Sequence, residues 1–188
     1  YELLVLHAHL PYVRHPNYYP PFIEENWLNE AIAETYIPLL KAFQHLKRDG
    51  VPFKITMTFT PTLVSMLTDR YLQENFLKYI DRLIELSDKE IQRTKYDPHL
   101  NYLSQYYHDR FLETKKLFLS LDKNIINGYL EFYKDGSLEV ITCNATHGFL
   151  PLLESEPSIV RAQIALGRRE HKLTWGIEPR GIWLAECG

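Results

Sequence analysis

Short apolar runs alternate with longer amphipathic segments along this chain. Four runs have the length and composition of buried β-strands, at residues 2–6, 53–59, 138–142 and 181–185. Apolar residues recur at helical spacing over residues 27–47 and 159–173, and Thr60 followed by Pro61 marks the start of a short helix. Because strands separated by helices pair in parallel within one sheet, the pattern predicts an α/β fold.

Residues 69–134, between the second and third strand-like runs, are expected to be helical almost throughout. Two apolar stripes at helical spacing support this: Leu72, Phe76, Tyr79, Ile80, Leu83, Ile84 and Leu86, then Tyr102, Tyr106, Phe111, Leu112, Leu117 and Leu121. Asp97 and Pro98 mark a break between the stripes, and Pro38 is expected to kink the earlier helix. The segment is longer than an ordinary crossover, so it is predicted to be a helical insertion.

Composition limits the function classes. The 188 residues carry a net charge of −3 and are 45% hydrophobic, which suits one domain with an apolar core and excludes a disordered chain. We expect neither nucleic acid nor a membrane as partner, because there is no basic block and no apolar run of membrane-spanning length. No signal peptide is recognisable, so a cytoplasmic location is expected. The 13 Tyr, 9 Phe and 3 Trp are compatible with a sugar-binding cleft, although aromatic residues also fill cores.

Polar, chemistry-bearing side chains follow three of the four predicted strands. His7 and His9 end the first, His147 lies just after the third, and Glu186 follows the fourth. In parallel α/β folds the ligand site lies beyond the carboxyl ends of the strands, so these side chains are predicted to share one rim.

Each of these residues has a plain structural alternative. The histidines could bind a metal, bond sugar hydroxyls or simply be satisfied core residues; we expect no metal and no cofactor. Glu186 follows an apolar run, where a carboxylate is costly unless it is paired or exposed. It is therefore either a carboxylate with a catalytic role or a strand end that points to solvent. Glu24 and Glu25 are expected to be solvated acids. The two cysteines, Cys143 and Cys187, are expected to be small packing residues.

Three segments of the chain resemble glycoside hydrolase family 57, and within it the 1,4-α-glucan branching enzyme type. The first is His7-Ala8-His9-Leu10-Pro11 with its surroundings, residues 6–14 and 24–40. The second is residues 141–153, and the third is residues 181–187, which resembles the stretch that holds the family's catalytic nucleophile. Order and spacing agree across essentially all of the chain.

The resemblance implies that residues 1–188 are the N-terminal part of a (β/α)7 barrel, with residues 69–134 as a helical insertion after strand two. It also implies a retaining mechanism on α-1,4-glucan or a glycogen-like polysaccharide, with Glu186 as nucleophile. The implied sugar contacts are His7, His9, His147, Trp27, Tyr19 and Trp183. The family's acid/base is an Asp on a later strand, so we expect the later strands and the C-terminal helical region to be absent from this chain. On that expectation the 188 residues alone would be inactive and poorly stable.

Three alternatives to glucan branching stay open. The first is α-amylase-type hydrolysis of α-1,4-glucan, because the acceptor site that would decide between water and sugar is not identified. The second is a metal-dependent deacetylase-like or α-mannosidase-like barrel, although such sites favour an Asp near the first strand, where this chain has His7-Ala8-His9. The third is a non-catalytic glucan-binding fragment.

Overall fold

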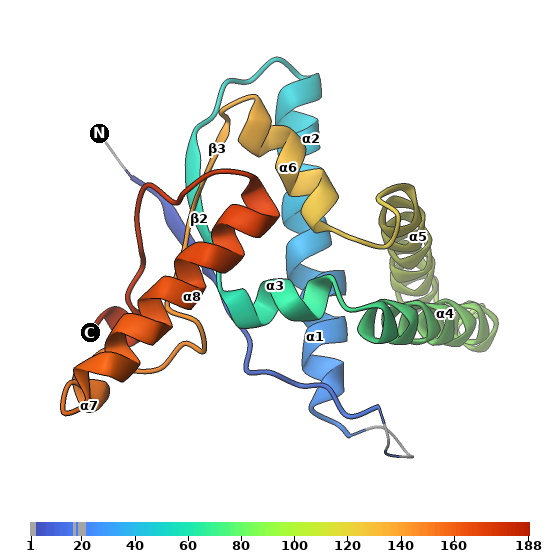
Figure 1. The fold of residues 1–188 in the computed structure, drawn as a ribbon. Helices are drawn as coiled ribbons and strands as arrows, with labels where there is room; N and C mark the ends of the chain where they lie inside the picture. Colours follow the sequence, from blue (N-terminus) through green and yellow to red (C-terminus); the bar gives the residue numbers. More distant parts are fainter. Residues whose placement is uncertain (1–2, 17, 19–21) are drawn as a thin grey trace.

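The computed structural model describes residues 3–16, 18 and 22–188. Three parallel strands form one sheet in the order β1 (Val5–Ala8), β2 (Ile55–Phe59) and β3 (Leu138–Ile141). Helices follow each strand and pack beside the sheet (Figure 1). The predicted α/β class with parallel strands is therefore confirmed.

Two strand predictions need correction. β1 begins at Val5 rather than at residue 2, and Leu3 and Leu4 before it are exposed. The predicted fourth strand at 181–185 is wrong: among the described residues it amounts to a single parallel bridge between Thr142 and Ile182. The chain then turns through a 3₁₀ helix, η2 (Ala185–Cys187), in which Glu186 has a φ of 54°. A strand cannot continue through that left-handed backbone conformation.

The sheet presents two chemically different faces. Along β2, Met57 and Phe59 point to one face, whereas Thr56, Thr58 and then Thr60 alternate with them. The register pairs His7 with Thr58 and Thr56 with Glu139, which places polar side chains of all three strands on the second face. The strands therefore alternate as is typical of a sheet with one apolar face packed against helices and one polar face.

A long helical crossover joins β1 to β2. It consists of α1 (Glu25–Ala31), a π-helical turn η1 (Ile32–Tyr36) and α2 (Ile37–Arg48), without interruption. The kink expected at Pro38 is replaced by this turn, in which the Ile37 N–H donates to the Ile32 carbonyl five residues back. Pro38 has no backbone N–H to donate. A π-turn accommodates it because its hydrogen bonds join residues five apart instead of four, so the neighbouring groups find other partners.

The segment after β2 is helical, as the apolar stripes predict. It comprises α3 (Pro61–Leu67), α4 (Arg70–Arg93), α5 (Pro98–Ser120) and α6 (Ile126–Lys134). The expected cap is present, since Thr60 Oγ1 accepts from the Leu63 N–H, and Asp69 and Asp97 cap α4 and α5 in the same way. α4 and α5 pack on one another and project from the body of the molecule (Figure 1). Their role as an insertion within a barrel stays a prediction.

Two further helices lie between β3 and the bridge at Ile182: α7 (Leu150–Leu153) and α8 (Pro157–Trp175). α8 approaches the backbone after β3 so closely that a Cβ on Gly167 would collide with the Cys143 carbonyl oxygen. In the part of the chain that the structure describes, no helix is both long and apolar enough to cross a membrane.

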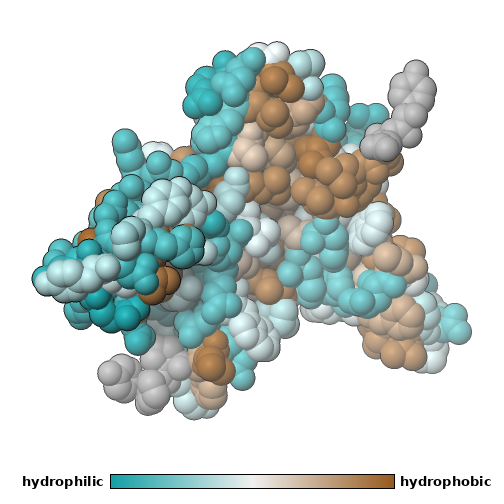
Figure 2. All heavy atoms as spheres, turned by 180° about the vertical axis from the view of Figure 1, so that it is seen from behind, coloured by the Kyte–Doolittle hydropathy of each residue, from teal (hydrophilic) through white to brown (hydrophobic). Residues whose placement is uncertain are grey.

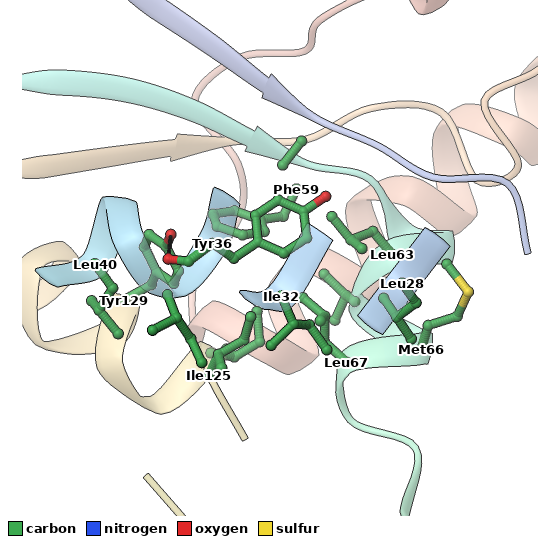
Figure 3. Packing of buried hydrophobic residues seen from close by; sticks show 14 of the residues in the cluster. Leu28, Ile32, Tyr36, Leu40, Phe59, Leu63, Met66, Leu67, Ile125 and Tyr129 are labelled. Atoms are coloured by element: carbon green, nitrogen blue, oxygen red, sulfur yellow. Dashed lines mark hydrogen bonds between the residues drawn. The ribbon is translucent and has the colours of Figure 1, made fainter. Parts of the chain in front are cut away.

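The core fills the space between the apolar sheet face and the helices (Figure 3). The ring of Phe59 on β2 packs against the ring of Tyr129 on α6, with centroids 5.0 Å apart, and against that of Trp175 on α8, with centroids 5.5 Å apart. The buried Tyr129 hydroxyl donates to the Tyr36 carbonyl at 2.7 Å, so its polar end is satisfied within the core. Burial raises the pKa of Tyr36, which keeps this phenol neutral. This packing fixes the strands whose ends carry the polar residues.

Apolar side chains also gather on the surface on the opposite side of the molecule from the view of Figure 1 (Figure 2). Leu3, Ile177 and Ile182 are exposed, and Leu3 and Ile177 line a shallow hollow together with Ile55 and Tyr133. The hollow lies toward the start of β2 and β3, away from the strand ends that carry the histidines.

Candidate active site

Three histidines meet at the carboxyl end of the sheet. His7 is on β1, His9 follows it, and His147 is in the loop after β3. His7 Nε2 lies 2.9 Å from His147 Nε2, and the rings of His9 and His147 stack with centroids 3.7 Å apart and planes inclined by 12°. The structure thus brings together the three histidines that the sequence placed at separate strand ends.

Two threonines of the polar sheet face hold these rings. Thr58 Oγ1 lies 2.5 Å from His7 Nδ1, and Thr60 Oγ1 lies 3.1 Å from His9 Nδ1. Both threonines are fully buried. Neither threonine was predicted as a site residue, although the alternation Thr56-x-Thr58-x-Thr60 along an otherwise apolar strand is a signal that could have identified them.

Glu186 lies beside the histidines, on η2. Its Oε1 is 3.8 Å from His147 Nδ1, and its side chain is 73% exposed. Both residues have left-handed backbones, with φ of 57° at His147 and 54° at Glu186. Non-glycine residues rarely adopt this conformation, and such strain often marks functional sites.

The loop that presents His147 is anchored on its buried side. Asn144 is fully buried, and its Nδ2 donates to the Gly148 carbonyl at 2.6 Å, which spans the His147 position. Gln163 on α8 holds the loop by accepting from the Thr146 N–H at 2.9 Å and donating to Thr146 Oγ1 at 2.8 Å. With the close approach of Gly167, these bonds set the height of His147 above the sheet.

The three imidazoles favour the neutral form. Desolvation, helped by the neighbouring His147, lowers the pKa of His7, and it lowers the pKa of His9 to about 4. Desolvation also lowers the pKa of His147, against the opposing charge of Glu186. Neutral imidazoles each carry one N–H donor and one acceptor nitrogen, which suits them to bonding hydroxyl groups.

Neutral rings are compatible with two directions of the hydrogen-bond chain, because the donor and acceptor nitrogens exchange with the tautomer. If the Thr58 hydroxyl donates to His7 Nδ1, then His7 Nε2–H donates to His147 Nε2. The remaining proton of His147 is then on Nδ1, the nitrogen that faces Glu186 Oε1. In this direction the Nδ1–H of His147 faces the carboxylate across 3.8 Å, which is beyond hydrogen-bond distance, and His147 is uncharged.

The remaining candidate binding residues differ in position. The Trp183 ring is half-buried with its centroid 6.3 Å from that of His7, so it belongs to the site. Trp27 is 46% exposed on α1 and, among the described residues, has no ring contact with the histidines. Tyr19 lies outside the described residues.

Two expectations about other side chains were wrong. Glu25 is not a solvated acid, because only 3% of it is exposed. Cys187 is exposed and so does not serve as a packing residue, whereas Cys143 is buried as expected. Burial raises the pKa of the Cys143 thiol to about 11, which keeps it protonated. Among the residues that the structure describes, no three His, Cys, Asp or Glu side chains converge in a way that could hold a metal ion.

The sequence pattern of glycosyl hydrolase family 57 matches residues 3–188. The chain is 40% identical, over its whole length, to 1,4-alpha-glucan branching enzyme TK1436 of Thermococcus kodakarensis. It is 25% identical, over 98% of its length, to the probable 1,4-alpha-glucan branching enzyme Rv3031 of Mycobacterium tuberculosis.

Solved structures agree with these matches. The alpha-amylase AmyC of Thermotoga maritima superposes with a TM-score of 0.94 at 46% identity, over 99% of this chain. The crystal structure of TK1436 in complex with glucose and additives superposes with a TM-score of 0.91 at 39% identity, over 98% of this chain. The chain spans only 27% of the length of TK1436 and 37% of Rv3031, and it covers 35% of the AmyC chain.

Proposed function

The chain belongs to glycosyl hydrolase family 57, and from that premise we propose that the full-length protein cleaves α-1,4-glucan with retention, using Glu186 as the nucleophile. One observation carries the proposal: Glu186 stands at a strand-end rim beside His147, at the end of the chain of contacts from Thr58 through His7. A carboxylate that attacks an anomeric carbon must be accessible to the sugar, and the Glu186 side chain is 73% exposed.

The proposed first step is attack by a Glu186 oxygen on the anomeric carbon at the cleaved bond. The carbon–oxygen bond to the leaving sugar breaks, and a covalent glycosyl-enzyme forms. A second carboxyl group roughly 5–5.5 Å away must protonate the leaving oxygen. From the family resemblance we propose that this group is an Asp on a later strand of the full-length protein.

The histidines have a binding role in this scheme. Both His7 nitrogens bond within the protein, so the nitrogens proposed to bond the sugar hydroxyls at the cleavage point are His9 Nε2 and His147 Nδ1, with His7 holding His147 in place. The half-buried Trp183 ring beside His7 offers an apolar face to a pyranose ring. Trp27 is retained as a candidate contact for a more distant sugar, and Tyr19 stays a sugar contact expected from the family resemblance alone.

The second step decides the product. Transfer of the glycosyl unit to a sugar 6-hydroxyl gives an α-1,6 branch, whereas transfer to water gives hydrolysis. We favour branching, because TK1436 and Rv3031 are named as branching enzymes and match essentially all of this chain. The likeness to the alpha-amylase AmyC, at 46% identity, supports hydrolysis as the second candidate.

We also propose that these residues form part of a (β/α)7 barrel, with the protein in the cytoplasm acting on a glycogen-like polymer. The polar sheet face, with His7, Thr58 and Glu139, would then line the interior of the barrel. Ile182, which already pairs with Thr142, would extend the sheet beyond β3.

Product analysis on the full-length protein tests the function. Incubation with amylose is expected to produce α-1,6 anomeric signals by NMR, with few new reducing ends. New reducing ends without α-1,6 signals would favour the amylase alternative. Binding of amylose without either product would favour the non-catalytic alternative, and no interaction at all would refute the proposal.

A further inference from the structure

Glu25, the first residue of α1, is a buried carboxylate outside the histidine cluster. Only 3% of it is exposed, yet no Lys or Arg is paired with it among the described residues. Its Oε1 accepts the backbone N–H of His15 at 2.6 Å and lies 3.7 Å from the imidazole Nδ1 of the same residue, and its Oε2 accepts from Tyr71 Oη at 3.4 Å and Asn75 Nδ2 at 3.3 Å. A buried carboxylate without a Lys or Arg partner is costly, so its retention calls for a structural or functional reason.

Glu25 and its partners come from three separate parts of the chain. His15 is in the segment that follows β1, Glu25 begins α1, and Tyr71 and Asn75 are on the first two turns of α4. Glu25 is therefore the common acceptor that joins the post-β1 segment to the long helical hairpin.

A second set of contacts supports the same junction. Arg14 Nε donates to Asp69 Oδ2 at 2.8 Å, and Asp69 is also the N-cap of α4. The Arg14 guanidinium lies over the Tyr71 ring, 5.5 Å from its centroid. Arg14 therefore pairs with Asp69, and the carboxylate of Glu25 accepts from the His15 N–H, Tyr71 and Asn75.

The segment that Glu25 holds continues directly from the active-site rim. His9 is six residues before His15, and Tyr12 between them is 57% exposed. Tyr12 lines a shallow hollow between α3 and α8, and the hollow reaches the rim at Ala145, which is two residues from His147. An exposed Tyr ring beside the rim offers a stacking surface for a pyranose.

We propose that Glu25 is a positioning residue that fixes the segment 12–15 against α1 and α4, so that Tyr12 stands where it stacks on the bound glucan chain. The proposal rests on the function proposed above. It gives α4 a role in substrate binding, because Tyr71 and Asn75 complete the acceptor site that orders the segment.

Glu25→Gln tests the proposal with almost no change in side-chain volume. The glutamine has one acceptor oxygen and one NH2 group, so either His15 N–H or the pair Tyr71 and Asn75 must face a donor instead of an acceptor. Glu30→Gln, on the exposed side of the same helix, is the matched control.

In the full-length protein, Glu25→Gln is expected to raise the KM for amylose at least fivefold and to leave kcat within twofold. Glu30→Gln and the wild type should agree in both constants. Tyr12→Ala should raise KM by a similar factor, and combined with Glu25→Gln should add little to it. A wild-type KM for Glu25→Gln would overturn the proposal, as would a loss confined to kcat.

Trypsin cleavage after Arg14 provides a readout that does not depend on glucan activity. We expect Glu25→Gln to be cut there at least fivefold faster than Glu30→Gln, with peptides assigned by mass spectrometry. Equal rates would overturn the proposal, and faster cutting with an unchanged KM would show a structural tie without a binding role, which also overturns it.

Two further outcomes are separated by the same experiments. If Glu25→Gln does not fold, Asn75→Ala removes only one donor and is expected to raise KM about twofold; an unchanged KM would overturn the proposal. If the wild type does not act on amylose, the proposed function fails. The inference about glucan binding then fails with it, whereas the cleavage rates still decide whether Glu25 orders the segment.

Discussion

The two faces of the three-stranded sheet show how one set of strands serves stability and chemistry at once. Phe59 and Met57 point into a dry core against the helices, whereas Thr58, one residue away from each, points to the face that carries His7. The apolar face is filled by interlocking side chains, and the polar face is ordered by hydrogen bonds between specific partners. Substitutions on the two faces should therefore affect different properties.

Backbone strain also distinguishes the packed core from the rim that carries His147 and Glu186. The strands and helices of the core keep ordinary backbone angles, whereas His147, Glu186 and Cys187 in the rim have φ between 54° and 60°. Asp122 and Lys123 are the other described non-glycine residues with positive φ, and they lie at the turn after α5. The rim is thus a region where the fold supports unfavourable local geometry to place two side chains.

The largest expected effect is on the rim. In the full-length protein, Glu186→Gln should lower glucan turnover by about 10⁴-fold, or about 5.5 kcal/mol of barrier, because the covalent route is lost. Amylose binding and thermal stability should stay close to wild type, since the side chain is mostly exposed. The control is Glu154→Gln, another exposed acid. Turnover within about tenfold of wild type would contradict the assignment.

The next effect is on the packed face. Phe59→Ala should lower the free energy of unfolding by about 3–5 kcal/mol, because it opens a cavity beside Tyr129 and Trp175. Urea denaturation followed by fluorescence measures this change. A loss below about 1 kcal/mol would show that the core does not depend on this ring.

Thr58→Val sharpens the comparison, because Thr58 is the neighbour of Phe59 on the opposite face. The substitution removes the hydroxyl at His7 Nδ1 and keeps the volume, so turnover should fall about tenfold, about 1.4 kcal/mol. The free energy of unfolding should change by about 1 kcal/mol or less. If stability falls as far as in Phe59→Ala while turnover per folded molecule is unchanged, the two faces do not divide in this way.

The sequence predicted the apolar face better than the polar one. Amphipathic periodicity identified the helices over 27–47 and 69–134 well, because burial of a continuous stripe leaves a regular mark. The run at 181–185 was misread, because apolar composition alone does not show whether backbone partners exist. The burial of Glu25 was missed for a related reason: its donors, Tyr71 and Asn75, lie far along the chain and adjoin it only in the fold.

In the site, the positions of the histidines were foreseeable and their mutual contacts were not. The rule that parallel strands end at one edge placed His7, His9 and His147 together. It could not supply the tautomers, which depend on Thr58 and on the short distance between His7 and His147. The roles of these residues in catalysis stay predictions.

The smallest effect is a pH dependence of stability. The pKa of His9 and that of His171 are each lowered to about 4, below the unfolded value near 6.5. The unfolded chain therefore binds protons that the folded chain does not, and stability should fall as pH decreases from about 6.5 to 4. The Tm should fall over the same pH range. His9→Gln should make this fall smaller by about 2 °C, whereas His99→Gln, on the exposed face of α5, should leave it unchanged. Identical Tm profiles for wild type and His9→Gln would contradict the burial of His9 as its cause.

Trapping the glycosyl-enzyme tests the central claim most directly. The full-length protein would be treated with a 5-fluoro-α-glucosyl fluoride, which slows the second step of a retaining enzyme, then digested and sequenced by mass spectrometry. The expected result is one fluoroglucosyl mass on the peptide that contains Glu186, absent from Glu186→Gln. A label on a different carboxylate would contradict the assignment of Glu186 as nucleophile, and so would efficient turnover of the reagent by the Glu186→Gln variant.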